Sequence, residues 1–279
     1  DLWEWDGTNW TWRSGSSQPY QDGTYGTKGV PAPSNVPGAR ADAVSWSGTD
    51  GSFWMFGGWS WGSWNDLWKW DGTNWCWVSG SNGANQTGTY GERGVAAPGN
   101  VPGSRSGSVA WKDGSGNLWL FGGQFWDYAA GQRAYANDLW KWDGANWTWV
   151  SGSNETSQPG AYGEQGVAAP ENIPGARSGS VGWMDDGGNL WLFGGLGYAA
   201  VGDLSNQRDL WKWDGTNWTW VSGSNEPFDF GTFGTKGIAA PANVPGVRTE
   251  AVSWTDGAGH FWLFGGTGWP QTEFNRVHL

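Results

Sequence analysis

The sequence predicts an all-β fold, and three observations carry that prediction. The 279 residues include 50 Gly and 29 Trp, while only 15% are charged. Tryptophan brings a large apolar surface and glycine allows tight turns, so this composition favours short strands packed face to face. One unit recurs four times along the chain, and no helical spacing of apolar residues appears in it.

The repeat is anchored on the tripeptide Asp-Leu-Trp, which opens each copy. This tripeptide occurs at Asp1, Asp66, Asp138 and Asp209. These positions divide the chain into units of residues 1–65, 66–137, 138–208 and 209–279. Because every copy holds the same parts in the same order, we expect the units to form a single domain.

Each unit predicts four strands in a fixed order. The segment Asp-Leu-Trp-Lys-Trp, with Glu4 replacing Lys in the first copy, leads through an Asp-Gly turn into Trp-Thr-Trp. After a long loop, Pro-Gly-x-Arg introduces a run of small residues that ends in Trp, and an apolar segment closing on Gly-Gly completes the unit. Short apolar runs bounded by such turns are typical of strands.

Both faces of these strands are apolar, as Leu118-Trp119-Leu120-Phe121 illustrates. A sheet with one face in water would instead alternate apolar and polar residues. Four-stranded sheets stacked radially around an axis cover each other on both faces. The sequence therefore predicts a four-bladed β-propeller of four-stranded antiparallel blades.

The repeated motifs resemble the kelch repeat over nearly the whole chain except the long loops. The likeness lies in Pro-Gly-Ala-Arg-Ser-Gly-Ser-Val at 174–181, Leu-Trp-Leu-Phe-Gly-Gly at 190–195, Asp-Leu-Trp-Lys-Trp at 209–213 and Asn-Trp-Thr-Trp at 217–220. The resemblance implies that the strand after Pro-Gly-x-Arg is innermost, the Gly-Gly strand second, Asp-Leu-Trp third and Trp-Thr-Trp outermost. Kelch repeats are usually shorter and more numerous, and kelch propellers serve as scaffolds, adaptors, adhesins and enzymes, so the resemblance does not define a function.

This strand order predicts how the ring closes. The chain starts with two outer strands, carrying Leu2, Trp3 and Trp5, and it reaches two inner strands at 250–254 and 261–264. Pairing the two halves would complete the fourth blade and remove two exposed strand edges. Residues 275–279, with Val277 and Leu279 on strand positions, compete for the same place. They are either a frayed terminus or a strand added to another molecule, and the first hairpin could likewise complete a neighbouring copy and propagate a filament.

Aromatic residues collect in the loops that we expect on one face. They are Trp59, Trp61, Trp64, Phe125, Trp126, Tyr128, Tyr198 and Trp269. Aromatic rings stack on sugar rings, so this face is a candidate carbohydrate-binding surface. The alternative is that the rings pack the loops onto the propeller or enter a protein contact.

Four arginines stand at the entrance to the innermost strands and are expected near the axis. They are Arg40, Arg105, Arg177 and Arg248. A ring of four positive charges could hold an anion. The alternative is that each arginine ties blades together through carbonyl or carboxylate oxygens.

Composition argues against several other functions. The net charge is −11 and the basic residues form no cluster, so we expect no nucleic-acid partner, and no apolar stretch predicts a membrane span. His260 and His278 are the only histidines and Cys76 is the only cysteine. We therefore expect no catalytic residues, metal or cofactor, and the paired His and Tyr-linked Cys of the copper oxidases that share kelch blades have no counterpart here.

These observations favour a non-catalytic, extracellular or cell-surface interaction or structural protein. The sequence begins inside a repeat rather than with Met, which suggests a signal peptide already removed. Its expected partner is a second copy, joined head to tail through the terminal strands, or an extracellular glycan or protein. A lectin-like module using the aromatic face and a fragment of a larger kelch array are the alternatives.

Overall fold

The chain folds entirely into strands, turns and loops. A computed structural model describes residues 1–226 and 230–268, and this part of the chain contains no helix. The all-β prediction is confirmed. Accordingly, the described residues hold no helix long and apolar enough to cross a membrane.

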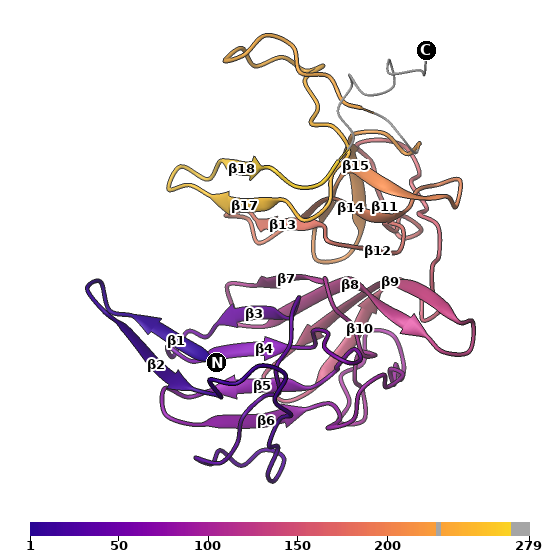
Figure 1. The fold of residues 1–279 in the computed structure, drawn as a ribbon. Helices are drawn as coiled ribbons and strands as arrows, with labels where there is room; N and C mark the ends of the chain where they lie inside the picture. The colour runs from indigo at the N-terminus through magenta and orange to yellow at the C-terminus, as the bar shows by residue number, and fades with distance from the viewer. Residues whose placement is uncertain (227–229, 269–279) are drawn as a thin grey trace, which may run out of the picture.

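Three complete antiparallel sheets form the body of the molecule (Figure 1). The first sheet consists of β3 (Val44–Ser47), β4 (Phe53–Phe56), β5 (Leu67–Trp70) and β6 (Trp75–Ser79). The second consists of β7 (Val109–Lys112), β8 (Leu118–Asp127), β9 (Gln132–Trp142) and β10 (Trp147–Ser151). The third consists of β13 (Val181–Met184), β14 (Leu190–Tyr198), β15 (Leu204–Trp213) and β16 (Trp218–Ser222), extended by the short strands β11 (Ala168–Ala169) and β12 (Arg177–Ser178).

Two hairpins flank the three sheets. The leading hairpin is β1 (Leu2–Trp5) with β2 (Trp10–Ser14), and the trailing hairpin is β17 (Val252–Thr255) with β18 (Phe261–Phe264). By repeat position, β1 and β2 correspond to the third and fourth strands of a complete sheet, whereas β17 and β18 correspond to its first and second strands.

The Asp-Gly and Gly-Gly motifs have identifiable structural roles. In the β5–β6 turn the Asp71 carboxylate accepts hydrogen bonds from the backbone N–H groups of Thr73 and Asn74, each at 2.8 Å, and Gly72 has a φ of 98°. Gly122 in β8 lies so close to the next sheet that an added Cβ would stand 2.7 Å from the Arg177 carbonyl oxygen. The glycines therefore allow both the tight turns and the close approach of neighbouring sheets.

Apolar residues fill the space between successive sheets. One buried cluster joins the first and second sheets, a second joins the second and third, and a third joins the third sheet to the trailing hairpin. Indole N–H groups also cross these interfaces, for example from Trp46 to the Trp111 carbonyl at 2.8 Å and from Trp111 to the Trp191 carbonyl at 3.2 Å. The second sheet, which lies between the first and third sheets, is covered on both faces, as predicted from its apolar composition, whereas the two hairpins keep exposed apolar side chains.

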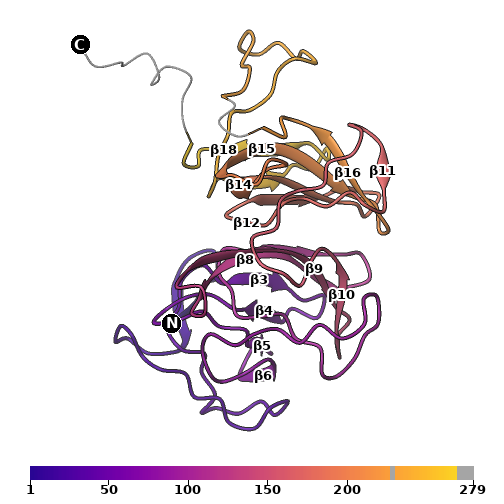
Figure 2. The ribbon, with the colours of Figure 1, turned by 90° about the vertical axis from the view of Figure 1, so that its right-hand side faces the viewer.

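The predicted closure of a four-bladed ring is not formed by the described residues. In sheet pairing, β1 joins only β2 and β17 joins only β18. The leading hairpin lies beside the first sheet and the trailing hairpin beside the third, at opposite ends of the molecule (Figure 1), and Figure 2 likewise shows β18 with the third sheet, away from β3–β6. The packing at each interface fixes the position of one sheet relative to the next. After three such interfaces the trailing hairpin does not reach the leading hairpin. The fold is thus a propeller-like stack with an open end. Val277 and Leu279 lie outside the described residues.

Candidate functional site

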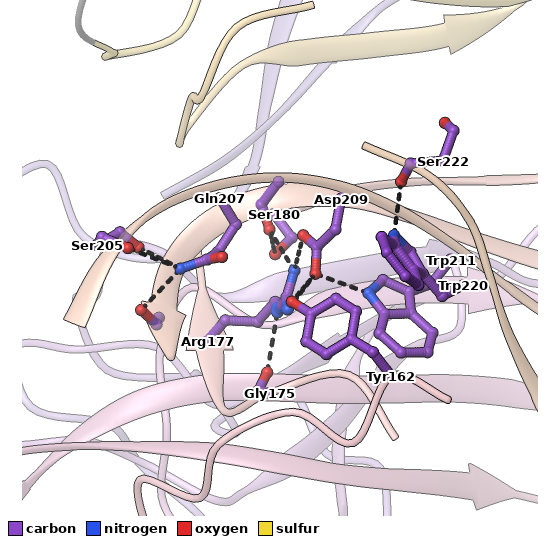
Figure 3. A network of polar contacts seen from close by, with 12 residues as sticks. Tyr162, Gly175, Arg177, Ser180, Ser205, Gln207, Asp209, Trp211, Trp220 and Ser222 are labelled. Atoms are coloured by element: carbon purple, nitrogen blue, oxygen red, sulfur yellow. Dashed lines mark hydrogen bonds and ion pairs between the residues drawn. The ribbon is translucent and has the colours of Figure 1, made fainter. Parts of the chain in front are cut away.

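A buried polar network surrounds the aspartate of the Asp-Leu-Trp motif in each complete sheet, and Figure 3 shows it in the third sheet. Arg177 pairs with Asp209 through two hydrogen bonds, from Nη1 to Oδ1 at 2.6 Å and from Nη2 to Oδ2 at 2.8 Å. The Tyr162 hydroxyl and the Trp211 indole donate to the same carboxylate at 2.5 and 2.7 Å. Arg177 also donates to the carbonyl oxygens of Gly175 and Gly194.

The same network recurs in the other two complete sheets. The corresponding residues are Tyr25, Arg40, Asp66 and Trp68 in the first sheet, and Tyr90, Arg105, Asp138 and Trp140 in the second. The arginine comes from the loop before the innermost strand, the aspartate from the third strand and the tyrosine from the long loop. One carboxylate therefore ties the sheet, its inner edge and its long loop together.

In the third sheet the pKa values of the aspartate and the tyrosine are shifted in opposite directions. Burial alone would raise the pKa of the Asp209 carboxyl, but the Arg177 charge and the hydrogen bonds that Asp209 accepts outweigh burial, so the pKa lies below 3.8. Burial, followed by the Asp209 charge, raises the pKa of the Tyr162 hydroxyl well above 10. The network thus keeps a charged aspartate and a neutral tyrosine over a wide pH range.

The fourth copy of the network is incomplete. Arg248 keeps its hydrogen bonds to the Gly246 and Gly265 carbonyl oxygens at 3.1 and 3.0 Å, yet it pairs with no carboxylate among the described residues. Phe233 occupies the position of the tyrosine. The matching aspartate by repeat position is Asp1, which accepts only the Trp3 indole N–H at 2.9 Å. Among the described residues, a cation without a carboxylate partner therefore precedes the trailing hairpin, and an anion without a cationic partner precedes β1 of the leading hairpin.

An aromatic contact between neighbouring sheets is incomplete in the same way. Phe56 packs edge-on against Trp147 of the following sheet, and Phe121 against Trp218, each with ring centroids 5.5 Å apart. The equivalent Phe264 on β18 is 71% exposed. The equivalent of Trp147 in the first sheet, Trp75, borders a cavity of about 520 Å³ that the leading hairpin also lines.

The predicted arginine ring is therefore not an anion site. Arg40, Arg105 and Arg177 are each neutralised by an aspartate of their own sheet, and their side chains are almost fully buried. This geometry corresponds to the structural alternative, in which the arginine ties strands together. Only Arg248 differs, because no aspartate among the described residues pairs with it.

The predicted aromatic residues fall into exposed and packed groups. Trp59, Trp61, Trp126 and Tyr128 are exposed. Trp64 is instead half-buried, with Arg40 over its ring, and Tyr198 is half-buried with its ring 5.9 Å from that of Tyr135. Trp269 lies outside the described residues.

Sequence reasoning missed the aspartates and tyrosines of the network. Asp66, Asp138 and Asp209 looked like the first residues of a motif, and Tyr25, Tyr90 and Tyr162 looked like parts of a loop. Their recurrence at fixed positions beside the predicted arginines was the available signal. Opposite charges repeated together in every unit indicate a pair that each unit needs.

The described residues hold no cluster of three or more His, Cys, Asp or Glu side chains that could bind a metal ion. His260 Nδ1 lies 3.0 Å from Asp256 Oδ2 in the exposed β17–β18 turn, and His278 lies outside the described residues. Cys76 stands on β6 in the place of the Thr found in other units.

Comparison with known proteins yields structural similarity only. No protein-family model and no curated protein matches the chain. Among solved structures, YjhT is 17% identical with a TM-score of 0.45 over 88% of this chain and 69% of that one. A protein of unknown function from Dyadobacter fermentans is 9% identical (TM-score 0.45, 80% of this chain and 60% of that one), and a copper-bound fungal alcohol oxidase of the AA5 family is 13% identical (TM-score 0.36, 82% and 48%).

Proposed function

We propose that this chain is a non-catalytic, extracellular or cell-surface structural protein of the kelch-like type that assembles head to tail. In this assembly the leading hairpin of one copy joins the trailing hairpin of another to form a complete four-stranded sheet. The observation that carries the proposal is the unpaired Arg248 on one hairpin and its missing partner, Asp1, on the other.

The strand order of the two hairpins supports this joining. Each complete sheet pairs its second strand with its third, as in Phe53 with Trp70 and Phe56 with Leu67. The unpaired edges of β18 and β1 are the second and third strands of the same arrangement. Pairing them would place Phe261 opposite Trp5 in the same antiparallel register, and it would cover two strand edges that otherwise remain open.

Charge supports the same register. In that arrangement Arg248 stands where Arg177 stands in the third sheet, and Asp1 stands where Asp209 stands. Desolvation already lowers the pKa of Arg248, and nothing else among its contacts offsets that effect. A bidentate carboxylate would offset it, because arginine and carboxylate geometries match.

The shape of the surface beside Trp75 also supports the joining of the two hairpins. By repeat position, Phe264 of one copy would enter the cavity of about 520 Å³ beside Trp75 of the next, as Phe56 contacts Trp147 within one copy. Apolar side chains now exposed on both hairpins would become buried. They are Trp3, Trp5, Trp10, Trp12, Val252, Trp254, Trp262 and Phe264. Burying this much aromatic surface is the main driving force that we expect for association.

A second copy is a better partner than the hairpin of the same chain. Closing one chain on itself would move neighbouring sheets relative to each other at three interfaces that are already packed with buried side chains. Indole hydrogen bonds also cross these interfaces. Packed interiors resist such distortion. A neighbouring copy can approach β18 without altering any of these interfaces.

The test reverses the charge on one side of the proposed junction at a time and measures the mass of the oligomers by light scattering. The unmodified chain should form oligomers whose mass rises with concentration on size-exclusion chromatography, and negative-stain images should show chains of subunits. Arg248→Asp and Asp1→Arg should each reduce the oligomers to monomers, because like charges would face each other at the junction. Arg133→Asp and Glu164→Arg, which change the charge of exposed side chains outside both terminal hairpins, serve as matched controls and should leave assembly intact.

Mixing the two single variants identifies the partner. Between copies, the trailing hairpin changed by Arg248→Asp in one variant meets the leading hairpin changed by Asp1→Arg in the other. The unmodified ends of the two variants also match, so the mixture should recover oligomers. Closure within one chain predicts monomers throughout, with recovery of stability only in the double variant. That result, or single variants that assemble like the controls, would refute the proposal.

A further inference from the structure

An aromatic residue stands three positions after the Gly-Gly motif in every unit. These residues are Trp61, Trp126, Tyr198 and Trp269. Strand pairing explains the Gly-Gly motif but does not require an aromatic residue beyond it. The surroundings of the three described residues differ, and they single out Trp126.

In the third sheet the residue at this position, Tyr198, packs against neighbouring residues. The Tyr198 backbone N–H donates to the Ala176 carbonyl at 3.0 Å, and the Tyr198 ring contacts Tyr135. In the first sheet the position is open, because Trp61 is 78% exposed and touches only the ring of Tyr20 among the aromatic residues. The cavity that Trp61 borders has a volume of only about 10 Å³.

In the second sheet the same position borders a groove of about 470 Å³, within the size range of ligand sites. The β8–β9 hairpin forms one wall, with Trp126 48% exposed and Tyr128 66% exposed. Residues 85–88, 103–105 and the loop containing Asn154 form the rest. Two aromatic side chains thus face solvent at the edge of a concave surface.

The wall is held in position before any ligand arrives. Asn85 adopts a φ of 59° and is fixed to Ser63, whose backbone N–H donates to the Asn85 side-chain oxygen at 2.9 Å and whose carbonyl accepts from the Asn85 N–H at 2.7 Å. The Asn85 side-chain amide then donates to the Tyr128 hydroxyl at 3.2 Å. Asp127 caps the hairpin turn by accepting from the Ala129 N–H at 2.9 Å. A preformed site loses less entropy on binding.

The polar groups of the groove are suited to a neutral ligand. The Arg105 guanidinium lines the groove but is paired with Asp138, so it offers no free positive charge. The hydroxyls of Thr87 and Thr156 and the Asn154 amide remain as donors and acceptors. With a net charge of −11 on the chain, an anionic ligand is disfavoured.

The groove continues past Trp126. A smaller cavity of about 190 Å³ shares Phe125 and Trp126 with it and adds Trp59, which is 54% exposed. The indole of Trp126 therefore stands between two hollows, with further aromatic surface on each side. Such spacing suits a chain of several sugar rings better than a single ring.

We propose that this groove, centred on Trp126 and Tyr128, binds a neutral oligosaccharide. Sugar rings stack on the two aromatic faces, and the amide and hydroxyl groups of the groove bind the sugar hydroxyls. The groove includes no residue of the leading or trailing hairpin, so sugar binding and head-to-tail assembly are independent of each other.

Native gel electrophoresis through embedded polysaccharides tests this assignment. The unmodified chain should be retarded by at least one of xyloglucan, galactomannan, hydroxyethylcellulose or soluble starch, and polygalacturonate should have no effect. Titration calorimetry with the matching oligosaccharide should show binding weakened about tenfold or more by Trp126→Ala or Tyr128→Ala. Trp61→Ala, at the same repeat position but outside the groove, is the matched control and should bind normally.

Each contrary result overturns the assignment. No retardation by any of the four neutral polymers would remove the ligand class, and retardation by polygalacturonate alone would replace it with an anionic one. Equal losses in Trp61→Ala and Trp126→Ala would place binding elsewhere. Near-ultraviolet circular dichroism checks that the variants keep their fold, and Tyr128→Ala keeps the test decisive if Trp126→Ala does not.

Discussion

The third sheet and the trailing hairpin contain the same repeated residues in different surroundings. Arg177 is fully buried against Asp209, whereas Arg248, at the same repeat position, is half-buried and lacks a carboxylate among the described residues. Phe121 is 0% exposed in the second sheet and Phe264 is 71% exposed on β18. The unit sequence is thus suited to a complete sheet. Among the described residues, β17 and β18 pair with no third or fourth strand.

The largest difference should appear when the arginine is removed. Arg177→Met leaves the buried Asp209 carboxylate without its counter-charge, so we expect the free energy of unfolding to fall by about 3–5 kcal/mol. Arg248→Met removes no ion pair with any other described residue and should change stability by less than about 0.5 kcal/mol. Urea unfolding followed by tryptophan fluorescence, at protein concentrations where the chain is monomeric, measures both. Equal losses would mean that Arg248 already has a partner.

The aromatic contact between sheets should show the same contrast. Phe121→Ala opens a cavity against Trp218 and should cost about 3–5 kcal/mol, the range for buried Phe truncation. Phe264→Ala removes an exposed ring and should cost well under about 1 kcal/mol in the monomer. Differential scanning calorimetry on dilute samples makes the comparison. At concentrations that allow assembly, Phe264→Ala should become the more harmful of the two for oligomer mass.

The strands and their apolar faces could be predicted from local sequence patterns, and the order of the strands within each sheet from the resemblance to kelch repeats. The lengths of β8 and β9 could not. We expected the apolar strand to close on Gly-Gly, yet β8 continues to Asp127 because Gly123 and the residues after it pair with β9. That pairing depends on the partner strand, which no apolar run reveals.

Neither the outcome of ring closure nor the buried network could be predicted from the sequence, for different reasons. Closure depends on the angle between packed sheets, and a count of repeats does not determine that angle. The network requires knowing that Arg105, Asp138 and Tyr90 meet, although they are far apart in the chain. Trp126 and Tyr128 were predicted to lie on the aromatic face, but no sequence pattern links Asn85 to Tyr128, whose hydroxyl accepts its hydrogen bond.

Acid should weaken the complete sheets through their buried aspartates. The pKa values of Asp138 and Asp209 are lower in the folded chain than the ordinary 3.8, so their stabilising contribution is present above about pH 4 and is lost as the pH falls below it. We expect a loss of about 1 kcal/mol for each buried aspartate between pH 5 and pH 3. Urea unfolding at both pH values tests this.

Added salt distinguishes the acid response of the buried aspartates from that of exposed charged pairs. Exposed pairs such as Lys69 with Asp50 are screened by about 0.5 M NaCl, whereas the buried pairs are screened much less. The acid-dependent loss should therefore persist in salt, and Arg248→Met should show the same loss as the unmodified chain. A loss that disappears in salt would assign the acid response to surface charges.

The smallest difference concerns the tyrosine, which the trailing unit replaces with Phe233. Tyr162→Phe removes one of several donors to Asp209 and should cost about 1 kcal/mol at pH 7, whereas Phe233→Tyr should gain nothing in a monomer, because no aspartate stands opposite. The pKa of Tyr162 is raised by burial and by Asp209, so its contribution is full below pH 10 and decreases as the pH rises above 10, where the unfolded chain loses the phenolic proton first. Urea unfolding at pH 8 and pH 11 should thus show a smaller alkaline loss in Tyr162→Phe than in the unmodified chain, with Phe233→Tyr unchanged. A benefit from Phe233→Tyr that appears only at assembling concentrations would mean that the new hydroxyl has met Asp1 of a neighbouring copy and restored the fourth network.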